Sequence, residues 1–256
     1  MKQKYKGKKM CKDCGCSINS SHTHGHHHDH HHENPSLKES KTIEVISKIL
    51  SKNDEEAKHN RAHFNEANTL CINLMSSPGS GKTTLLESTI KALKNELKIA
   101  VIEGDLETNN DALRVKNAGA LAYQITTGQS CHLDAFMVHE ALHHLAIDDV
   151  DLLFIENVGN LVCPASYDLG EHLNVVLLSV TEGSDKPQKY PVMFKKADIV
   201  LITKADLAHH FDFDIKEATR LIKELNPRAD IITLDAKNGT NMELWYKVLK
   251  LKKELF

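Results

Sequence analysis

The chain has 256 residues, of which 41% are hydrophobic, and this is enough to bury the core of one α/β domain with an appendage. Its formal net charge of −3 gives no general reason to expect nucleic-acid binding. The first ten residues are basic but lack the apolar run of a signal peptide, and no stretch approaches the roughly 18 apolar residues of a membrane helix. We therefore expect a cytoplasmic protein that binds neither nucleic acid nor membrane.

Residues 1–36 are polar, rich in cysteine and histidine, and nearly free of large apolar side chains. We expect this tail to be disordered until it binds a ligand. In a reducing compartment a C-x-x-C group is more typical of a metal site than of a disulfide framework. Neutral imidazoles donate lone pairs to Ni²⁺, Cu²⁺ or Zn²⁺, and three clustered thiolates suit a tighter single site. The candidate ligands are Cys11, Cys14, Cys16, His22, His24, His26, His27, His28, His30, His31 and His32.

Three other interpretations of this tail are possible. The irregular spacing of the histidines and the internal Asp29 argue against an expression tag. A zinc finger would need a second, regularly spaced ligand pair and apolar residues around which to fold. A tail that only solvates the protein is the third possibility. Metal binding accounts best for the combination of thiols and imidazoles.

We expect residues 37–68 to form a helical lead-in to the main domain. Apolar side chains recur there at helical spacing, and a charged stretch follows, which predicts one or two helices. The apolar positions are Ile43, Val45, Ile46, Ile49 and Leu50.

Residues 69–256 alternate short apolar runs with amphipathic segments such as 82–96 and 213–224. Strands that are apolar throughout and separated by helices predict a doubly wound, mainly parallel sheet covered on both faces. Ligands of such a domain bind at the carboxyl ends of the strands. The run containing Cys71 is one of these strands, so we interpret Cys71 as an ordinary buried thiol. The predicted strands span 70–75, 98–103, 120–125, 151–156, 174–180, 197–203 and 230–235.

The stretch "SSPGSGKTT" follows the first predicted strand and opens a helix, as a phosphate-binding loop does. Glycines let the backbone N–H groups wrap a phosphate, and the helix amino terminus adds partial positive charge. Lys82 is expected to reach the β- and γ-phosphates. Ser76 stands where the pattern G-x-x-x-x-G-K-[ST] has its first glycine. The expected phosphate contacts are Gly79, Ser80, Gly81, Lys82, Thr83 and Thr84.

Carboxylates after the second and fourth predicted strands are candidates for a Mg²⁺ site, completed by the Thr83 hydroxyl. Asp105 is the first candidate and Asp111 the second, in "EGDLETNNDA". Glu156 ends the fourth strand and resembles the carboxylate that senses the γ-phosphate in an E-x-x-G loop. Each could instead be a helix cap or a solvated carboxylate. The predicted catalytic residues are Lys82, Asp105 and Glu156.

The stretch "TKADL" follows the sixth predicted strand, where the N-K-x-D guanine motif is found in other proteins. Asp206 can accept hydrogen bonds from the ring N–H and exocyclic amine of guanine, whereas adenine offers neither donor, so GTP is favoured over ATP. Lys204 is expected to lay its alkyl stem across the base. Thr203 replaces the usual Asn, which weakens the expected brace behind this loop. Ala236 and Lys237 lie where a second base-contacting loop belongs.

Cys131 and His132 are adjacent before a predicted helix, and Cys163 lies seven residues after Glu156. A helix amino terminus favours the thiolate, and S, N, S ligation suits Zn²⁺ or Ni²⁺. Such a site could be completed by a second subunit. The alternative is that both cysteines are small loop residues and His132 caps a helix.

The chain resembles the HypB family, the hydrogenase nickel-incorporation GTPases, through the motifs "CKDCGC", "SSPGSGKTT", "EGDLETNNDA", "CHLDA", "IENVGNLVCP", "VTEGSDKPQKYPVMF" and "TKADL". The resemblance extends from Cys11 to the last predicted helix. The pairing of "CHLDA" with "ENVGNLVCP" is far more specific than the phosphate loop alone.

The resemblance implies a P-loop GTPase fold, slow hydrolysis of GTP to GDP, and a homodimer that nucleotide binding favours. It also implies nickel delivery to the [NiFe]-hydrogenase large subunit with a HypA-type nickel co-chaperone. Cys131, His132 and Cys163 would form a metal site near or across the dimer interface, and Cys11, Cys14 and Cys16 would match a tight nickel motif.

The leading hypothesis is therefore a nickel chaperone whose metal release is gated by GTP. A urease-type nickel-insertion GTPase is the nearest alternative, although its Cys-Pro-His triplet is absent. A His-rich nickel store comes from a different functional class, and a small-molecule kinase is the weakest interpretation because no acceptor pocket is evident.

Overall fold

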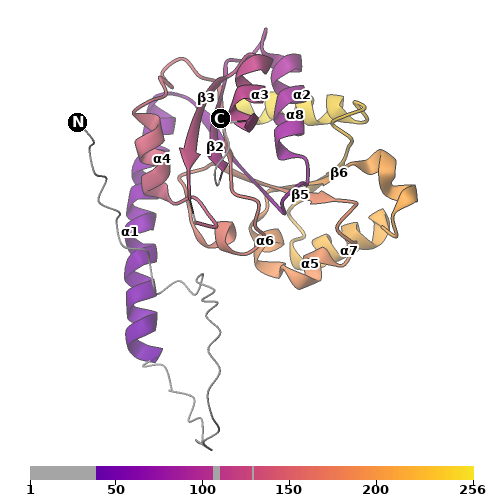
Figure 1. The fold of residues 1–256 in the computed structure, drawn as a ribbon, viewed down its shortest axis with the longest axis horizontal. Coiled ribbons are helices and arrows are strands. Elements are labelled where there is room, and N and C mark those ends of the chain that lie inside the picture. The colour runs from indigo at the N-terminus through magenta and orange to yellow at the C-terminus, as the bar shows by residue number, and fades with distance from the viewer. Residues whose placement is uncertain (1–38, 106–109, 129) are drawn as a thin grey trace, which may run out of the picture. The chain divides into compact units, whose positions relative to one another are not determined.

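The computed structural model describes residues 39–105, 110–128 and 130–256 (Figure 1). The predicted metal ligands of the tail, from Cys11 to His32, lie outside these residues. By its internal contacts the chain divides between Leu50 and Ser51. The sheet and the candidate sites belong to the unit that begins at Ser51.

A parallel sheet of seven strands runs through the described part of the chain, in the order β3-β2-β4-β1-β5-β6-β7. Every neighbouring pair is parallel, as predicted. The strands are apolar along almost their whole length because both faces of the sheet are covered. They span β1 (Leu70–Ser76), β2 (Ile99–Asp105), β3 (Leu121–Thr126), β4 (Leu152–Glu156), β5 (Leu173–Ser179), β6 (Ile199–Thr203) and β7 (Asp230–Thr233).

Helices pack on the two faces of this sheet and bury separate clusters of apolar side chains. One cluster joins the strands to α2 (Lys82–Leu93), α3 (Asn110–Ala118) and α8 (Met242–Glu254), with Trp245 fully buried. On the other face the strands pack against the second half of α1 (Glu39–Glu66), α4 (Ala135–Leu142), α6 (Pro191–Lys196) and α7 (Ile215–Leu225). The remaining short helices are α5 (Lys186–Lys189), η1 (Cys163–Ser166) and η2 (Ala205–His210). The doubly wound arrangement is therefore confirmed.

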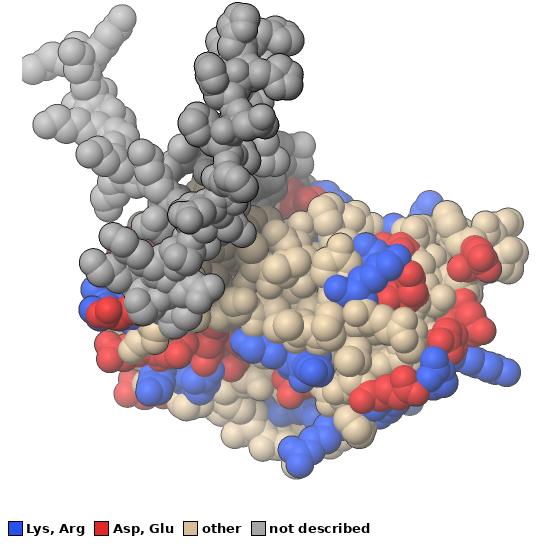
Figure 2. All heavy atoms as spheres, turned by 90° about the horizontal axis from the view of Figure 1, so that it is seen from below, with Lys and Arg blue, Asp and Glu red and all other residues tan. Residues whose placement is uncertain are grey.

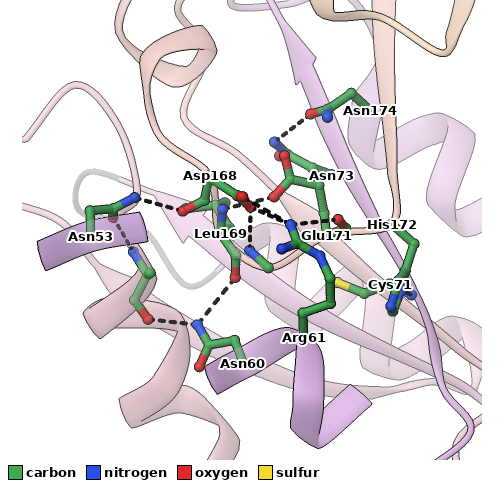
Figure 3. Close-up of polar contacts among 12 residues, drawn as sticks. Asn53, Asn60, Arg61, Cys71, Asn73, Asp168, Leu169, Glu171, His172 and Asn174 are labelled. Atoms are coloured by element: carbon green, nitrogen blue, oxygen red, sulfur yellow. Dashed lines mark hydrogen bonds and ion pairs between the residues drawn. The ribbon is translucent and has the colours of Figure 1, made fainter. Parts of the chain in front are cut away.

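The predicted lead-in contains one helix, α1, whose second half is held to the main domain by polar side chains (Figure 3). The Asn53 amide donates to the Asp168 carbonyl at 2.8 Å. Asn60 donates to the carbonyl of Leu169 at 3.1 Å. Arg61 contacts both oxygens of the Asp168 carboxylate, at 2.7 and 2.9 Å. These contacts fix α1 against the segment that leads into β5.

Cys71 lies in β1 and is fully buried, as predicted for an ordinary core thiol. Burial raises the pKa of its thiol well above the usual value, so the group is neutral and unreactive. The neighbouring His172 ring accepts a hydrogen bond from the Cys71 N–H at 3.0 Å.

Charged side chains of both signs are interspersed on the face of the molecule shown in Figure 2. Several ion pairs among the described residues lie along a single helix and are exposed, as Arg220 with Glu217 at 2.6 Å. Such pairs contribute little to stability. Along the described part of the chain, no helix combines the length and apolarity needed to cross a bilayer.

Candidate nucleotide and metal sites

The predicted phosphate loop connects the end of β1 to the start of α2. Gly79 and Gly81 have φ angles of 72° and 98°, which is the left-handed region that glycine adopts without strain. The loop opens onto a cavity of about 560 Å³ at the carboxyl ends of the strands. Lining residues come from 78–84, 103–104 and 156–159, with Asp111, Arg114 and Lys204.

Lys82 and Ser76 face each other beneath this loop. Ser76 is fully buried and Lys82 is only 7% exposed. The Lys82 ammonium donates to the Ser76 hydroxyl at 2.9 Å. The serine that replaces the first glycine of the pattern therefore gives the lysine a hydrogen-bond partner.

Glu156 lies where the sequence predicts, at the end of β4 and beside the phosphate loop. Its Oε1 accepts a hydrogen bond from the Thr83 hydroxyl at 3.0 Å. The carboxyl is almost completely buried, and burial raises its pKa while the Lys82 charge opposes that rise. The pair of Thr83 and Glu156 is the expected Mg²⁺ combination.

Glu103 is a second buried carboxyl in this site, and the sequence analysis did not identify it. It is 2% exposed, and burial together with the Glu156 charge raises its pKa to about 10. Glu103 is therefore protonated at neutral pH. A glutamate directly after four apolar residues of a strand was the signal that could have revealed it, because burying an unpaired charge is costly.

Two oxygens of these carboxyls are unsatisfied. Glu103 Oε1 and Glu156 Oε2 are buried and have no hydrogen-bond partner. Buried polar atoms are nearly always paired, so orphaned oxygens call for an explanation. A Mg²⁺ ion takes oxygen ligands from carboxylates, hydroxyls and phosphates, so the free Glu156 oxygen and the Thr83 hydroxyl fit that ion.

The other two acidic candidates differ in what the structure describes. The Asp105 backbone ends β2, but its side chain is outside the described atoms. Asp111 lines the cavity and pairs with Arg114 at 2.9 Å. The Asp111 charge is therefore already paired with a cation. Arg114 also contacts Glu87 at 2.6 Å.

Residues at the end of β6 contact the phosphate loop directly. The Thr203 hydroxyl donates to the Ser80 carbonyl at 2.8 Å, so threonine provides a brace at the position where we expected a weaker one. Lys204 adopts a left-handed conformation with φ of 57°, and its ammonium donates to the Gly79 carbonyl at 2.7 Å. The predicted base-reading segment and the phosphate loop are thus hydrogen-bonded to each other.

Asp206 is joined to the loop after β7. Its Oδ2 accepts from the Asn238 amide at 3.0 Å and from the Thr240 hydroxyl at 2.9 Å. The loop is shaped by Asp235, whose side chain accepts from the Lys237 N–H at 2.9 Å. The Ala236 carbonyl accepts from Ser88 of α2 at 2.9 Å. The two predicted base-contacting loops are therefore neighbours.

Glu182 is another residue that the sequence analysis missed. It lies after β5, and its Oε1 accepts from the Ser80 hydroxyl at 2.6 Å. Its Oε2 accepts from the Ser77 hydroxyl at 2.5 Å. Both serines belong to the phosphate loop, so this carboxylate orients the loop from outside. Nothing in the spacing of the sequence indicates that pairing.

Cys131, His132 and Cys163 lie close together within one chain. Their potential ligand atoms are all within 4.8 Å of one another. The Cys131 sulfur is 3.7 Å from His132 Nδ1. The His132 ring stacks on Tyr167 with centroids 3.9 Å apart. Burial lowers the pKa of His132, so its ring is neutral and can donate a lone pair to a metal ion.

The cap of α4 is Asp134, whose carboxylate accepts from the Met137 N–H at 2.8 Å. His132 is therefore not the cap, which removes one alternative for that residue. Cys131 lies three residues before the capping position, outside the helix itself.

Asn157 connects the nucleotide cavity to this cysteine and histidine group. It follows Glu156 directly, and its Oδ1 accepts from the N–H of Leu133, the residue after His132, at 3.3 Å. The same oxygen accepts from the Val158 N–H at 2.9 Å. The side chain is 1% exposed. One buried amide thus contacts both loops.

Comparison with known proteins agrees with this geometry. The sequence model of the CobW/HypB/UreG nucleotide-binding domain matches residues 70–233. The hydrogenase maturation factor HypB of Rhizobium leguminosarum bv. viciae is 51% identical over 217 residues, which cover 85% of this chain and 73% of that protein. The chain belongs to the HypB family. It therefore has a nucleotide-binding domain of the P-loop GTPase type.

Two solved HypB structures have the same fold. HypB from Helicobacter pylori in complex with nickel has a TM-score of 0.76 at 45% identity, covering 79% of this chain and 95% of that one. HypB from Archaeoglobus fulgidus has a TM-score of 0.75 at 43% identity, covering 80% of this chain and all of the other. The P-loop GTPase-like α/β fold predicted from the sequence is thereby confirmed.

Proposed function

We propose that this protein is a GTP-hydrolysing nickel chaperone that helps deliver Ni²⁺ to the [NiFe]-hydrogenase large subunit. The nucleotide state gates release of the metal. The observation that carries the proposal is the Asn157 side chain, which hydrogen-bonds to the loop of His132 while following Glu156 of the nucleotide cavity. Relatives named as hydrogenase maturation factors support the biological setting.

The chain's own residues bind and orient GTP in this scheme. The N–H groups of 79–84 surround the phosphates, and the Lys82 ammonium moves from Ser76 to the β- and γ-phosphates. Asp206 accepts hydrogen bonds from guanine, with Lys204 against the base. Thr83 and Glu156 would hold Mg²⁺, with Asp105 and Asp111 as further candidates, and the ion would neutralise charge on the phosphates.

Cys131, His132 and Cys163 bind the transferred metal in this proposal. Thiolate and imidazole ligands suit Ni²⁺, and Zn²⁺ is an alternative occupant. A structure of a relative solved in complex with nickel supports Ni²⁺ as the cargo. Three ligands leave coordination positions open, which favours transfer over permanent retention.

The gate works through a short chain of contacts. Glu156, which would hold the ion beside the γ-phosphate, shifts with the nucleotide state, and Asn157 moves with it because the two are adjacent in the chain. Asn157 holds the Leu133 N–H, so a shift there changes where His132 is placed relative to the two sulfurs. Hydrolysis therefore times metal release.

The tail, the homodimer and a co-chaperone complete the proposed function. The tail of residues 1–36 buffers nickel through its histidines and binds one ion more tightly through Cys11, Cys14 and Cys16. The protein acts in the cytoplasm as a homodimer and receives or passes nickel with a HypA-type co-chaperone. The slow GTPase reaction belongs to the same scheme.

Nickel affinity measured with GDP and with a non-hydrolysable GTP analogue tests the gate. We expect the two affinities to differ in the wild type and to become equal in Cys131→Ser/Cys163→Ser, because the metal that still binds then contacts no loop of the nucleotide site. Lys82→Ala is the matched control, since it removes nucleotide binding but leaves the thiols. Equal affinities in the wild-type protein would end the gating proposal.

Urease maturation is a second candidate recipient pathway. The Helicobacter hepaticus protein named hydrogenase/urease maturation factor HypB is 53% identical over 196 residues, covering 75% of this chain. Hydrogenase and urease activities in cells that lack this gene distinguish the two, and loss of urease activity alone would overturn the hydrogenase assignment.

A further inference from the structure

Two pairs of histidines face each other where α1 packs beside α4. His59 and His63 are four residues apart on α1, and His139 and a residue beyond the end of α4, His143, have the same spacing. Side chains four residues apart lie on one face of a helix. Figure 1 shows α1 and α4 side by side, and the Asn60 amide fixes them by donating to the Ala135 carbonyl at 2.8 Å.

Glu56 lies between the inner histidine of each pair. Its Oε1 is 3.4 Å from His59 Nδ1 and 3.2 Å from His139 Nδ1. The two rings stack with centroids 5.0 Å apart. A single carboxylate oxygen thus faces one nitrogen from each helix.

The outer histidines surround this group. His63 Nε2 is 3.2 Å from His59 Nε2, and the rings of His139 and His143 are 4.8 Å apart at their centroids. His59, His63 and His143 are exposed, whereas His139 and Glu56 are partly buried. The cluster is therefore open to an ion from solvent while its inner members are held by packing.

The distances match those between ligands of one metal ion. The ligand atoms of Glu56, His59 and His139 all lie within 4.8 Å of one another. Bonds of about 2.0–2.1 Å in a tetrahedral site place neighbouring ligands roughly 3.3 Å apart. The observed separations of 3.2 and 3.4 Å from the Glu56 oxygen are close to that value. Only small side-chain movements are needed.

The hydrogen positions at His59 suit such a site. At His139, Nδ1 faces Asn60 Oδ1 at 3.2 Å as well as Glu56, so a bound ion would replace the hydrogen on that nitrogen. Without an ion, a hydrogen on Nδ1 of His59 points at the Glu56 oxygen, and Nε2 accepts from His63. Neutral imidazole has a second tautomer, which places the lone pair on Nδ1 and the hydrogen on Nε2. In that form His59 ligates through Nδ1 and donates to His63 through Nε2, as metal-bound histidines usually donate to a neighbour.

We propose that Glu56, His59 and His139 form a surface binding site for a divalent transition-metal ion of the Ni²⁺ and Zn²⁺ class, with His63 orienting His59. Imidazole and carboxylate donors suit both ions. The site is separate from the cysteine and histidine group of the nucleotide domain and uses no residue of the tail. It does not depend on the proposed GTP gate, because binding here requires no nucleotide.

Thermal unfolding of the full chain, with and without zinc or nickel sulfate in parallel, tests the proposal. An ion that binds only the folded protein raises Tm, and one that links α1 to α4 does so directly. We expect His59→Asn/His139→Asn to lose about 2–4 °C of the rise seen in the wild type. The tail and the Cys131 group are unchanged, so their contributions cancel in the comparison.

The matched control is His209→Asn/His210→Asn on η2. These rings are also adjacent, with centroids 3.8 Å apart, and both are exposed. No carboxylate completes a ligand cluster with them among the described residues. This variant should retain the full metal-induced rise.

Two further measurements test metal binding at this site if the double variant is destabilised. Glu56→Gln preserves size but removes the anionic ligand, and it should weaken zinc binding at this site at least tenfold. Crystals of the full chain soaked in zinc should give an anomalous peak between His59 and His139. An equal metal-induced rise in wild type and His59→Asn/His139→Asn, or no peak there, would mean that Glu56 only accepts hydrogen bonds from the two rings.

Discussion

Glu103 and Glu156 are two neighbouring carboxyl groups beneath the phosphate loop, and they affect how stability depends on pH. Both are buried, and Glu103 is held in its protonated form by burial and by its neighbour. A carboxyl whose folded-state pKa lies above its unfolded value stabilises the fold less as pH rises. Between the two pKa values the folded state keeps the proton while the unfolded chain releases it, so rising pH favours unfolding. For Glu103 this loss of stability extends from about pH 4.5 to about pH 10.

Glu103→Gln should therefore make the nucleotide-free protein more stable at pH 8. The amide has the shape of the neutral acid and carries no proton to release, so the decline in stability with rising pH should flatten. We expect Tm to increase by about 3 °C or more at pH 8 and little at pH 5. An unchanged Tm across this range would show that Glu103 is ionised in the fold.

Gly159 is a second residue whose substitution should affect the phosphate loop, because there is no room for a Cβ atom at this position. A Cβ there would lie 2.9 Å from Pro78 Cα and 3.0 Å from its nitrogen, both in the phosphate-loop backbone. Gly159→Ala should displace that loop and weaken GDP binding at least tenfold, while the apolar core is untouched. Calorimetric titration with GDP measures the loss, and far-UV circular dichroism checks the fold. Wild-type GDP affinity would refute the close approach.

At the scale of elements, His172 joins β1, α1 and the start of β5. It accepts from the Cys71 N–H through Nδ1, so it is neutral in the fold. Burial and the nearby Arg61 charge lower its pKa from 6.5 to about 4. A depressed histidine pKa means that the unfolded chain binds more protons between those values, so stability falls as pH drops from 6.5 to 4.

His172→Asn tests this contribution to acid sensitivity. The Asn oxygen can occupy the place of Nδ1 and accept from Cys71 without titrating. Because the ring is partly exposed, we expect about 1–2 kcal/mol less loss of unfolding free energy between pH 6.5 and 4 in the variant. Urea unfolding at several pH values measures it. Parallel pH profiles for both proteins would contradict the assignment.

The elements themselves were largely predictable from the sequence. Seven apolar runs predicted seven strands because a covered parallel sheet leaves no polar face, and the glycines of 79–81 marked the phosphate loop. The partners of Glu182 and Asn157 were not predictable, since each contacts residues that the topology brings together. The histidines of α1 and α4 were missed for the same reason: 76 or more residues separate the pairs along the chain.

At the scale of the whole molecule, Asn157 lies where the proposed nucleotide and metal sites meet. Asn157→Ala removes the acceptor for Leu133 while leaving Lys82, Thr83 and the metal ligands in place. We expect it to bind GTP and nickel, but the ratio of nickel affinities with GTP analogue and GDP should fall to about one, which is complete loss of the coupling free energy. A wild-type ratio would show that coupling takes another route.

Removal of residues 1–36 separates a chaperone from a store. The sheet, the phosphate loop and the Cys131 group all lie beyond this segment, so GTP hydrolysis should remain within about twofold of the full chain. Hydrogenase maturation should be reduced but not abolished. If cells carrying the shortened chain keep hydrolysis and lose all maturation, nickel storage in the tail is the essential function.

The hydroxyl of Ser76 has a consequence for the life of the protein between reaction cycles. A buried ammonium without an acceptor would make the nucleotide-free state costly and short-lived. Here the Lys82 ammonium donates to the Ser76 hydroxyl, and in the proposed scheme it exchanges this acceptor for phosphate oxygens when nucleotide binds. The folded protein can therefore persist with its nucleotide cavity empty, so the proposed scheme sets no order in which nucleotide and metal must bind.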